Sequence, residues 1–92
     1  MTRVDQQNTI TLRLPASLDF ADLPRVGLAA LLRIHRIDPG DVEDLATSVH
    51  EIATKLAAAG SEVVVEFRVT DAEVAVNLTG DGRTIRISSP RS

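Results

Sequence analysis

Hydrophobic and polar residues alternate with a period of two at the start and in the second half of the chain, and with a helical period between these regions. Strict alternation of apolar and polar residues is typical of a strand that is buried on one face. Asp81-Gly82, between the last two alternating segments, is a dipeptide that two-residue hairpin turns favour. The expected strands are residues 9–14, 62–70, 73–79 and 83–88.

Two amphipathic helices are predicted between the first strand and the second. The first covers residues 23–37 and follows Asp22, which is placed to cap it. The second begins with Asp38 as the cap and Pro39 at the first helical position, and it ends at Gly60. Apolar residues at helical spacing are expected to face the core, namely Leu23, Val26, Ala30, Leu31, Ile34 and Ile37 in the first helix and Val42, Leu45, Val49, Ile52 and Leu56 in the second.

The element order β-α-α-β-β-β predicts an α+β two-layer sandwich, with two helices on one face of a four-stranded, mainly antiparallel sheet. We expect a flexible N-terminus over residues 1–8, a single domain over 9–88 and a tail over 89–92. Gly27, inside the first helix, indicates a close approach to a neighbour. The other face of the sheet is expected to be mixed, with Val64, Ala75 and Asn77 beside Thr9, Thr11, Arg13, Glu66, Arg68, Arg86 and Ser88.

Composition excludes several classes of function. Only 2% of the 92 residues are aromatic, so Phe20 and Phe67 are the only large core fillers and platforms for base stacking are disfavoured. The chain has no cysteine, which excludes disulfides and thiolate metal sites. A net charge of −3 argues against a nucleic-acid surface. Since Val26–Leu32 is the longest strongly apolar run, we expect no membrane span. The lack of cysteine and of a leader segment suits a cytoplasmic location, which we expect.

The two histidines do not form a recognisable metal motif. His50-Glu51 lacks the second histidine of the metalloprotease helix, because Thr54 stands where that histidine is required. His35 lies on the other predicted helix, so a metal shared by both histidines is an alternative that no spacing supports. We therefore predict no metal site and two partly exposed helical histidines.

Four segments carry a resemblance to a known family: the strand end Leu14-Pro15-Ala16-Ser17, the link Arg36-Ile37-Asp38-Pro39-Gly40-Asp41, the helix over residues 42–57, and Gly80-Asp81-Gly82. In this layout residues 12–82 resemble a shortened, degenerate member of the histidine-kinase-like ATPase fold. The branch that they resemble is that of the bacterial serine-kinase anti-sigma factors, which are partner-switching regulators.

The resemblance implies where a nucleotide site would lie. Glu51 aligns with the catalytic base of the family, but Lys55 stands where an asparagine holds magnesium, and an ammonium group has no acceptor for a metal. Gly80 takes the place of the aspartate that reads adenine, and only Gly82 fits the family's glycine. The chain then runs directly into Arg83-Thr84-Ile85 without the family's lid. The resemblance therefore implies a lost nucleotide site, with no cofactor.

Three hypotheses for the function follow. The leading one is a non-catalytic regulatory module whose partner is a sigma factor or its antagonist. Its partner-binding candidates are Arg25, Arg33 and Arg36. The plainer interpretation of these arginines is that they form a solvated helix face. The second hypothesis is an ATP- and magnesium-binding serine kinase in which Glu51 acts as the catalytic base. The plainer interpretation of Glu51 and Lys55 is a helical ion pair. The third is a structural homodimer, formed sheet to sheet or edge to edge.

Overall fold

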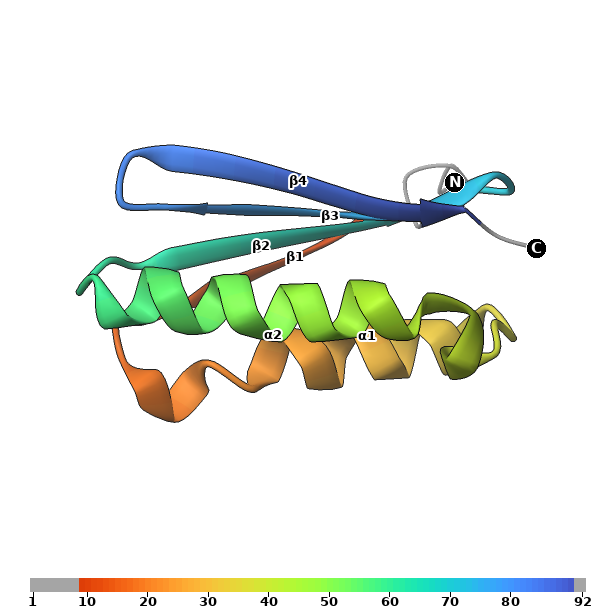
Figure 1. Cartoon of the computed structure of the whole chain (residues 1–92), viewed down its shortest axis with the longest axis horizontal. Helices are drawn as coiled ribbons and strands as arrows, with labels where there is room; N and C mark the ends of the chain where they lie inside the picture. Colours follow the sequence, from red (N-terminus) through yellow and green to blue (C-terminus); the bar gives the residue numbers. More distant parts are fainter. Residues whose placement is uncertain (1–8, 91–92) are drawn as a thin grey trace, which may run out of the picture.

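The computed structural model describes residues 9–90, which form two layers, a sheet and a pair of antiparallel helices beneath it (Figure 1). The α+β fold and the order β-α-α-β-β-β are confirmed. The elements are β1 (Thr9–Leu14), η2 (Leu18–Phe20), α1 (Leu23–Ile34), η3 (Pro39–Val42), α2 (Glu43–Ala58), β2 (Val63–Val69), β3 (Glu73–Gly80) and β4 (Arg83–Pro90). The η elements are single turns of 3-10 helix.

All neighbouring strands are antiparallel, in the order β1-β2-β3-β4. The register places residues of one face side by side across the sheet, so the predicted alternation is confirmed. One row toward the helices is Ile10, Phe67, Val76 and Ile87. One row on the other face is Thr11, Glu66, Asn77 and Arg86, in which Asn77 Nδ2 donates to Glu66 Oε1 at 3.2 Å.

The hairpin between β3 and β4 forms where it was expected. Asp81 and Gly82 have φ values of 51° and 72°, and both central residues of a type I′ turn require positive φ. The Asp81 amide also donates to Ser61 Oγ at 2.6 Å, which joins this turn to the α2–β2 connection. Strand β4 is longer than predicted, because Ser89 and Pro90 pair with Val74 and Glu73 rather than forming a tail. The expectations for residues 1–8 and 91–92 lie outside the described residues.

Helix α1 ends three residues before the predicted boundary at residue 37. The amide of Ile37 donates to the carbonyl of Leu32 at 2.8 Å, and Arg36 between them has a φ of 58°. This is the geometry of a Schellman C-cap, in which glycine usually occupies the left-handed position. The sequence has arginine at this position, so it contains no glycine that would indicate the end of the helix. The turn still returns Ile37 to the core, where it is 9% exposed.

The start of α2 also differs from the prediction. Asp38 acts as a cap, accepting from the Gly40 amide at 2.9 Å, but the turn that it caps is the 3-10 turn η3. The regular α-helix begins at Glu43, with two acidic residues in its first turn. Its expected apolar seam is confirmed except at Ile52, which is only half-buried. Ala53 and Ala57 complete the buried face of this helix.

The core consists almost entirely of aliphatic side chains, as expected, with Phe67 as its largest fully buried side chain, 1% exposed. Phe20 was wrongly assigned to this core. It lies on η2, outside the regular elements, and is 39% exposed. One aromatic residue therefore fills the interior while the other contributes to the surface.

The face that α1 buries also differs from the prediction. Its buried residues are Pro24, Leu28, Leu31 and Leu32. A Cβ at Gly27 would lie 3.3 Å from Leu12 Cδ1 and 3.6 Å from Phe67 Cε2, so the close approach expected at this glycine is confirmed. With this face on the sheet, four residues that were expected in the core are exposed, namely Leu23, Val26, Ala30 and Ile34.

We expect Phe67→Ala to lower the free energy of unfolding by about 3–5 kcal/mol, since it removes the largest fully buried side chain. Phe20→Ala, the matched control, should lose only about 1–2 kcal/mol, because its side chain is 39% exposed and leaves no closed cavity. Urea unfolding followed by far-UV circular dichroism measures both. A Phe67→Ala chain that is unfolded in buffer agrees with the expectation, whereas equal losses in the two variants would contradict it.

Candidate functional site

Glu51 and Lys55, the two helical residues of the inferred nucleotide site, both lie exposed on α2. The ion pair expected between them is absent, since no contact within 4.0 Å joins the two side chains in the part of the chain that the structure describes. An exposed pair at this spacing gains only about 0.3–0.5 kcal/mol, which the lost freedom of two long side chains can offset. Both side chains therefore extend separately into solvent.

The two glycines of the inferred site have roles in the fold itself. A Cβ at Gly80 would lie 3.1 Å from the backbone oxygen of Glu62 and 3.5 Å from the Leu56 side chain, so the strand end must be free of a side chain there. Gly82 has open space around it but needs its positive φ for the hairpin. Neither glycine requires a ligand to explain it.

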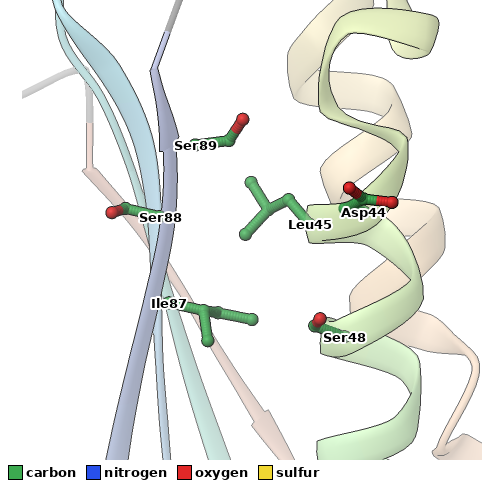
Figure 2. Close-up of a pocket in the computed structure, with 6 residues that line it drawn as sticks. All are labelled: Asp44, Leu45, Ser48, Ile87, Ser88 and Ser89. Atoms are coloured by element: carbon green, nitrogen blue, oxygen red, sulfur yellow. The ribbon is translucent and has the colours of Figure 1, made fainter.

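A groove of about 300 Å³ separates α2 from β4 on the side of α2 that carries Glu51 and Lys55. Figure 2 shows Leu45 of α2 and Ile87 of β4 pointing into this space, while Ser88 points away from it. Ser48, Ser89 and Asp44 complete its lining. The lining contains a carboxylate and no cationic side chain, so phosphate groups would meet repulsion there rather than a cradle.

The histidines lie at opposite ends of the helix pair. His35 is the C-cap of α1, whereas His50 Nδ1 lies 3.5 Å from Oδ1 of Asp22, at the start of α1. A helix of 12 residues separates these ends by about 18 Å, too far for one metal ion to join both rings. Over residues 9–90 no group of three or more metal-ligating side chains gathers.

Asp22 occupies the N-cap position of α1, but its side chain makes no capping hydrogen bond. The carboxylate instead forms an ion pair with Arg25 at 2.7 Å, across one turn of α1. Both Arg25 and His50 approach the same oxygen, Oδ1. No ion pair within residues 9–90 uses the other oxygen, Oδ2.

The three candidate arginines do not form one cluster. Arg25 belongs to the first turn of α1 and is engaged by Asp22, whereas Arg33 and Arg36 lie at the other end of the helix. Neither Arg33 nor Arg36 makes an ion pair within the described range. Their charges lie near the negative end of the helix dipole, which stabilises α1.

The most distinctive surface lies on the side of α1 next to the edge strand β1. We call the exposed residues Leu23, Val26, Ala30 and Ile34 the α1 strip. Ile34 is 71% exposed and Val26 is 54% exposed, which makes them unusual for aliphatic residues of a regular helix. Ala30 and Ile34 of the strip also line an apolar groove of about 210 Å³ between α1 and the edge strand β1, together with Ile10, Gly27 and Phe67.

The sequence did not predict this surface because α1 has apolar residues on most of its circumference. Leu28 and Leu32 form one possible core face, and the α1 strip forms another at equally regular spacing. Periodicity alone cannot choose between them. Gly27 indicates where the helix approaches the sheet, but it lies between the two faces, about 20° from Ile34 and about 40° from Leu31 around the axis, so it does not distinguish them.

Comparison with known proteins adds no family assignment: no protein-family model matches the sequence, and no curated protein matches it significantly. Within residues 9–90, no helix is both long and apolar enough to cross a membrane.

We expect Gly80→Ala to lower the free energy of unfolding by about 1–3 kcal/mol through overpacking against backbone. Gly82→Ala should cost about 1 kcal/mol through its left-handed conformation, and Gly82→Asn, the matched control, should lose less because asparagine tolerates that conformation. Thermal unfolding without nucleotide measures all three. Glycine variants as stable as the wild type would show that these glycines have no role in the fold.

Proposed function

We propose that this chain is a non-catalytic regulatory module that acts by binding another protein, as a degenerate relative of the anti-sigma factor ATPases. The observation that carries the proposal is the α1 strip, a row of exposed aliphatic side chains next to an apolar groove. Contiguous exposed apolar surface of this kind marks contact sites for proteins in otherwise polar surfaces.

The surroundings of the α1 strip also suit a protein contact. Arg33 lies beside Ile34 at the end of the helix, and neither Arg33 nor Arg36 is committed to an ion pair in the described part of the chain. Arginine beside an apolar centre is a common composition of protein interfaces. In this proposal Arg33 and Arg36 contact the partner directly, while Arg25 is held by Asp22 and acts through the local structure of α1.

The residues at the inferred nucleotide site support a protein-binding role for the chain rather than a catalytic one. Lys55 cannot replace an amide oxygen as a magnesium ligand, and Gly80 offers no side chain to read a base. The nearby groove has Asp44 as its charged lining residue. The resemblance suggests a sigma factor or its antagonist as the partner, which would place the protein in the cytoplasm.

We expect no heat of binding when ATP with magnesium is titrated into the protein at micromolar concentrations, and no phosphate transfer to a sigma-factor antagonist. The physical reason is the missing metal ligand on α2. Isothermal titration calorimetry and a labelled-phosphate assay measure the two, with Glu51→Ala as the matched variant. Micromolar binding, or transfer that Glu51→Ala abolishes, would overturn the non-catalytic assignment in favour of the serine-kinase hypothesis.

We expect the tagged protein to retain a sigma factor or its antagonist from the native extract, identified by mass spectrometry. Val26→Glu should lose this partner, since it places a charge in the α1 strip. Ala29→Glu, exposed on the same helix but outside the strip, should retain it. The same retention by both variants, or retention of neither protein class by the wild type, would contradict the proposal.

A further inference from the structure

We propose that the free edge of β4, together with the groove between β4 and α2, binds an extended segment of another protein as an added strand. The segment that fits carries an aliphatic side chain and, two positions away, a basic side chain on the face that it turns toward the helices. This surface is separate from the α1 strip and goes beyond the proposed function, since β1 and β4 lie at opposite edges of the sheet. The backbone of β4, the filling of the groove and the charge of its lining carry the inference.

Strand β4 presents unpaired backbone groups at its outer edge. Among residues 9–90 it pairs only with β3. Gly80 and Arg83 flank the two-residue turn and form a hydrogen-bonded pair, and such pairs alternate with non-bonded pairs along an antiparallel ladder. The N–H and C=O groups of Thr84, Arg86 and Ser88 therefore point away from β3. A row of this kind is a template on which another strand can pair.

The charged side chains of β4 leave this edge accessible. Arg86 Nη2 donates to Oε2 of Glu73 at 3.0 Å, and Glu73 belongs to β3, so this arginine is directed away from the free edge. Arg83 lies 3.8 Å from Asp81 at the hairpin turn. Pro90 has no N–H and closes the template at the end of the strand. The accessible edge over residues 84–88 thus suits a short extended segment.

The groove beside this edge is only partly filled. Leu45 of α2 and Ile87 of β4 point into it from opposite sides (Figure 2). Ile87 faces the helices but is only half-buried, because no further strand in the described chain covers it. A strand added beside β4 would direct every second side chain toward the helices. An aliphatic side chain of that strand would enter the groove and cover Leu45 and Ile87.

The charge of the lining favours a basic residue near the aliphatic one. Asp44 is the one charged residue among those that line the groove. No ion pair within residues 9–90 engages its carboxylate. Side chains on one face of a strand are about 7 Å apart, so a lysine or arginine two positions from the aliphatic residue can reach Asp44.

These features together indicate strand addition, in which main-chain hydrogen bonds supply affinity and pockets for alternate side chains supply selectivity. At about 300 Å³ the groove lies at the lower end of the range for small-molecule pockets, which is about 300–1,000 Å³. It is therefore better suited to one or two side chains of a bound segment than to a whole small ligand.

The probe for this surface is the peptide acetyl-Thr-Lys-Thr-Ile-Thr-Lys-Thr-amide, in which threonine alternates with one isoleucine and its flanking lysines. Titration followed by amide NMR spectra should show saturable binding at submillimolar concentrations. The amide signals of Thr84, Arg86 and Ser88 should shift and exchange more slowly with deuterium, whereas those of Val26 and Ile34 should not change. Absence of binding, or shifts confined to α1, would overturn the inference.

Ser88→Pro tests the backbone contact. It removes an N–H that points away from β3, so the ladder with β3 remains intact and the variant should stay folded. Peptide binding should weaken by roughly ten-fold or more, because the ring also blocks the edge. Ser88→Ala, the matched control, keeps the amide and should bind within about two-fold of the wild type. Circular dichroism verifies folding, and equal affinities for the two folded variants would contradict strand addition.

Asp44→Lys tests the charge preference independently of the backbone. It should weaken binding of the lysine peptide by about three- to ten-fold and strengthen binding of the same peptide with glutamate in place of both lysines. Glu43→Lys makes the same change of charge about 100° further around α2 from the groove, and it should leave both affinities within about two-fold. A charge preference that Asp44→Lys does not alter would overturn the basic segment as the occupant.

Two further outcomes separate this surface from other interpretations. A wild-type dimer that Ser88→Pro dissociates would show that a second copy occupies the edge, and it would overturn the foreign segment. Val26→Glu should bind the peptide as the wild type does, since the α1 strip is not involved. Failure of the regulatory partner to bind at the α1 strip would remove the proposed function and leave the β4 surface, whereas loss of peptide binding in Val26→Glu would contradict the separation of the two surfaces.

Discussion

The contact between Gly27 and the sheet sets how closely the first helix can lie against the strands. At this position α1 lies so close to Leu12 and Phe67 that even one methyl group would press on both side chains. Gly27 therefore allows the helix to lie against the sheet, while Leu28, Leu31 and Leu32 form its buried face. The residues on the other side of Gly27 from these leucines remain exposed.

What remains outside is the α1 strip, and its exposure has no counterpart on the second helix. On α2 the large aliphatic residues are buried or half-buried, and the outward positions are polar, as in an ordinary surface helix. On α1 the outward positions include Val26 and Ile34. The asymmetry between two helices of the same layer is the main reason to assign the regulatory contact to α1 rather than to the groove between α2 and β4.

The sheet was predictable from the sequence because each strand buries one face, and a period of two then fixes which residues point inward. The hairpin at Asp81-Gly82 was predictable for a similar reason, since its backbone requirement selects specific residues. The end of α1 was not predictable, because Arg36 adopts the left-handed conformation that glycine usually occupies at the end of a helix. Phe20 was misplaced because composition favours a buried aromatic residue, whereas its position in η2 is set by the connection between β1 and α1.

The candidate site was less predictable than the fold. Resemblance pointed to α2 and to the turn after β3, but there the glycines serve packing and turn geometry, and Glu51 and Lys55 remain apart. The α1 strip depends on which of two apolar faces packs on the sheet, and hydrophobic spacing alone leaves that choice open. The packing of Leu28, Leu31 and Leu32 in the folded chain resolves it.

The most direct test of the orientation of α1 uses the absence of cysteine from the chain. A single cysteine is introduced by Val26→Cys, by Ile34→Cys or by Leu28→Cys, and its reaction with a thiol reagent is followed in the native protein. The exposure of Val26 and Ile34 predicts rapid labelling at positions 26 and 34, and the burial of Leu28 predicts labelling at position 28 only when the protein unfolds. Rapid labelling at position 28 together with protection at positions 26 and 34 would contradict the orientation of the helix and the exposure of the α1 strip.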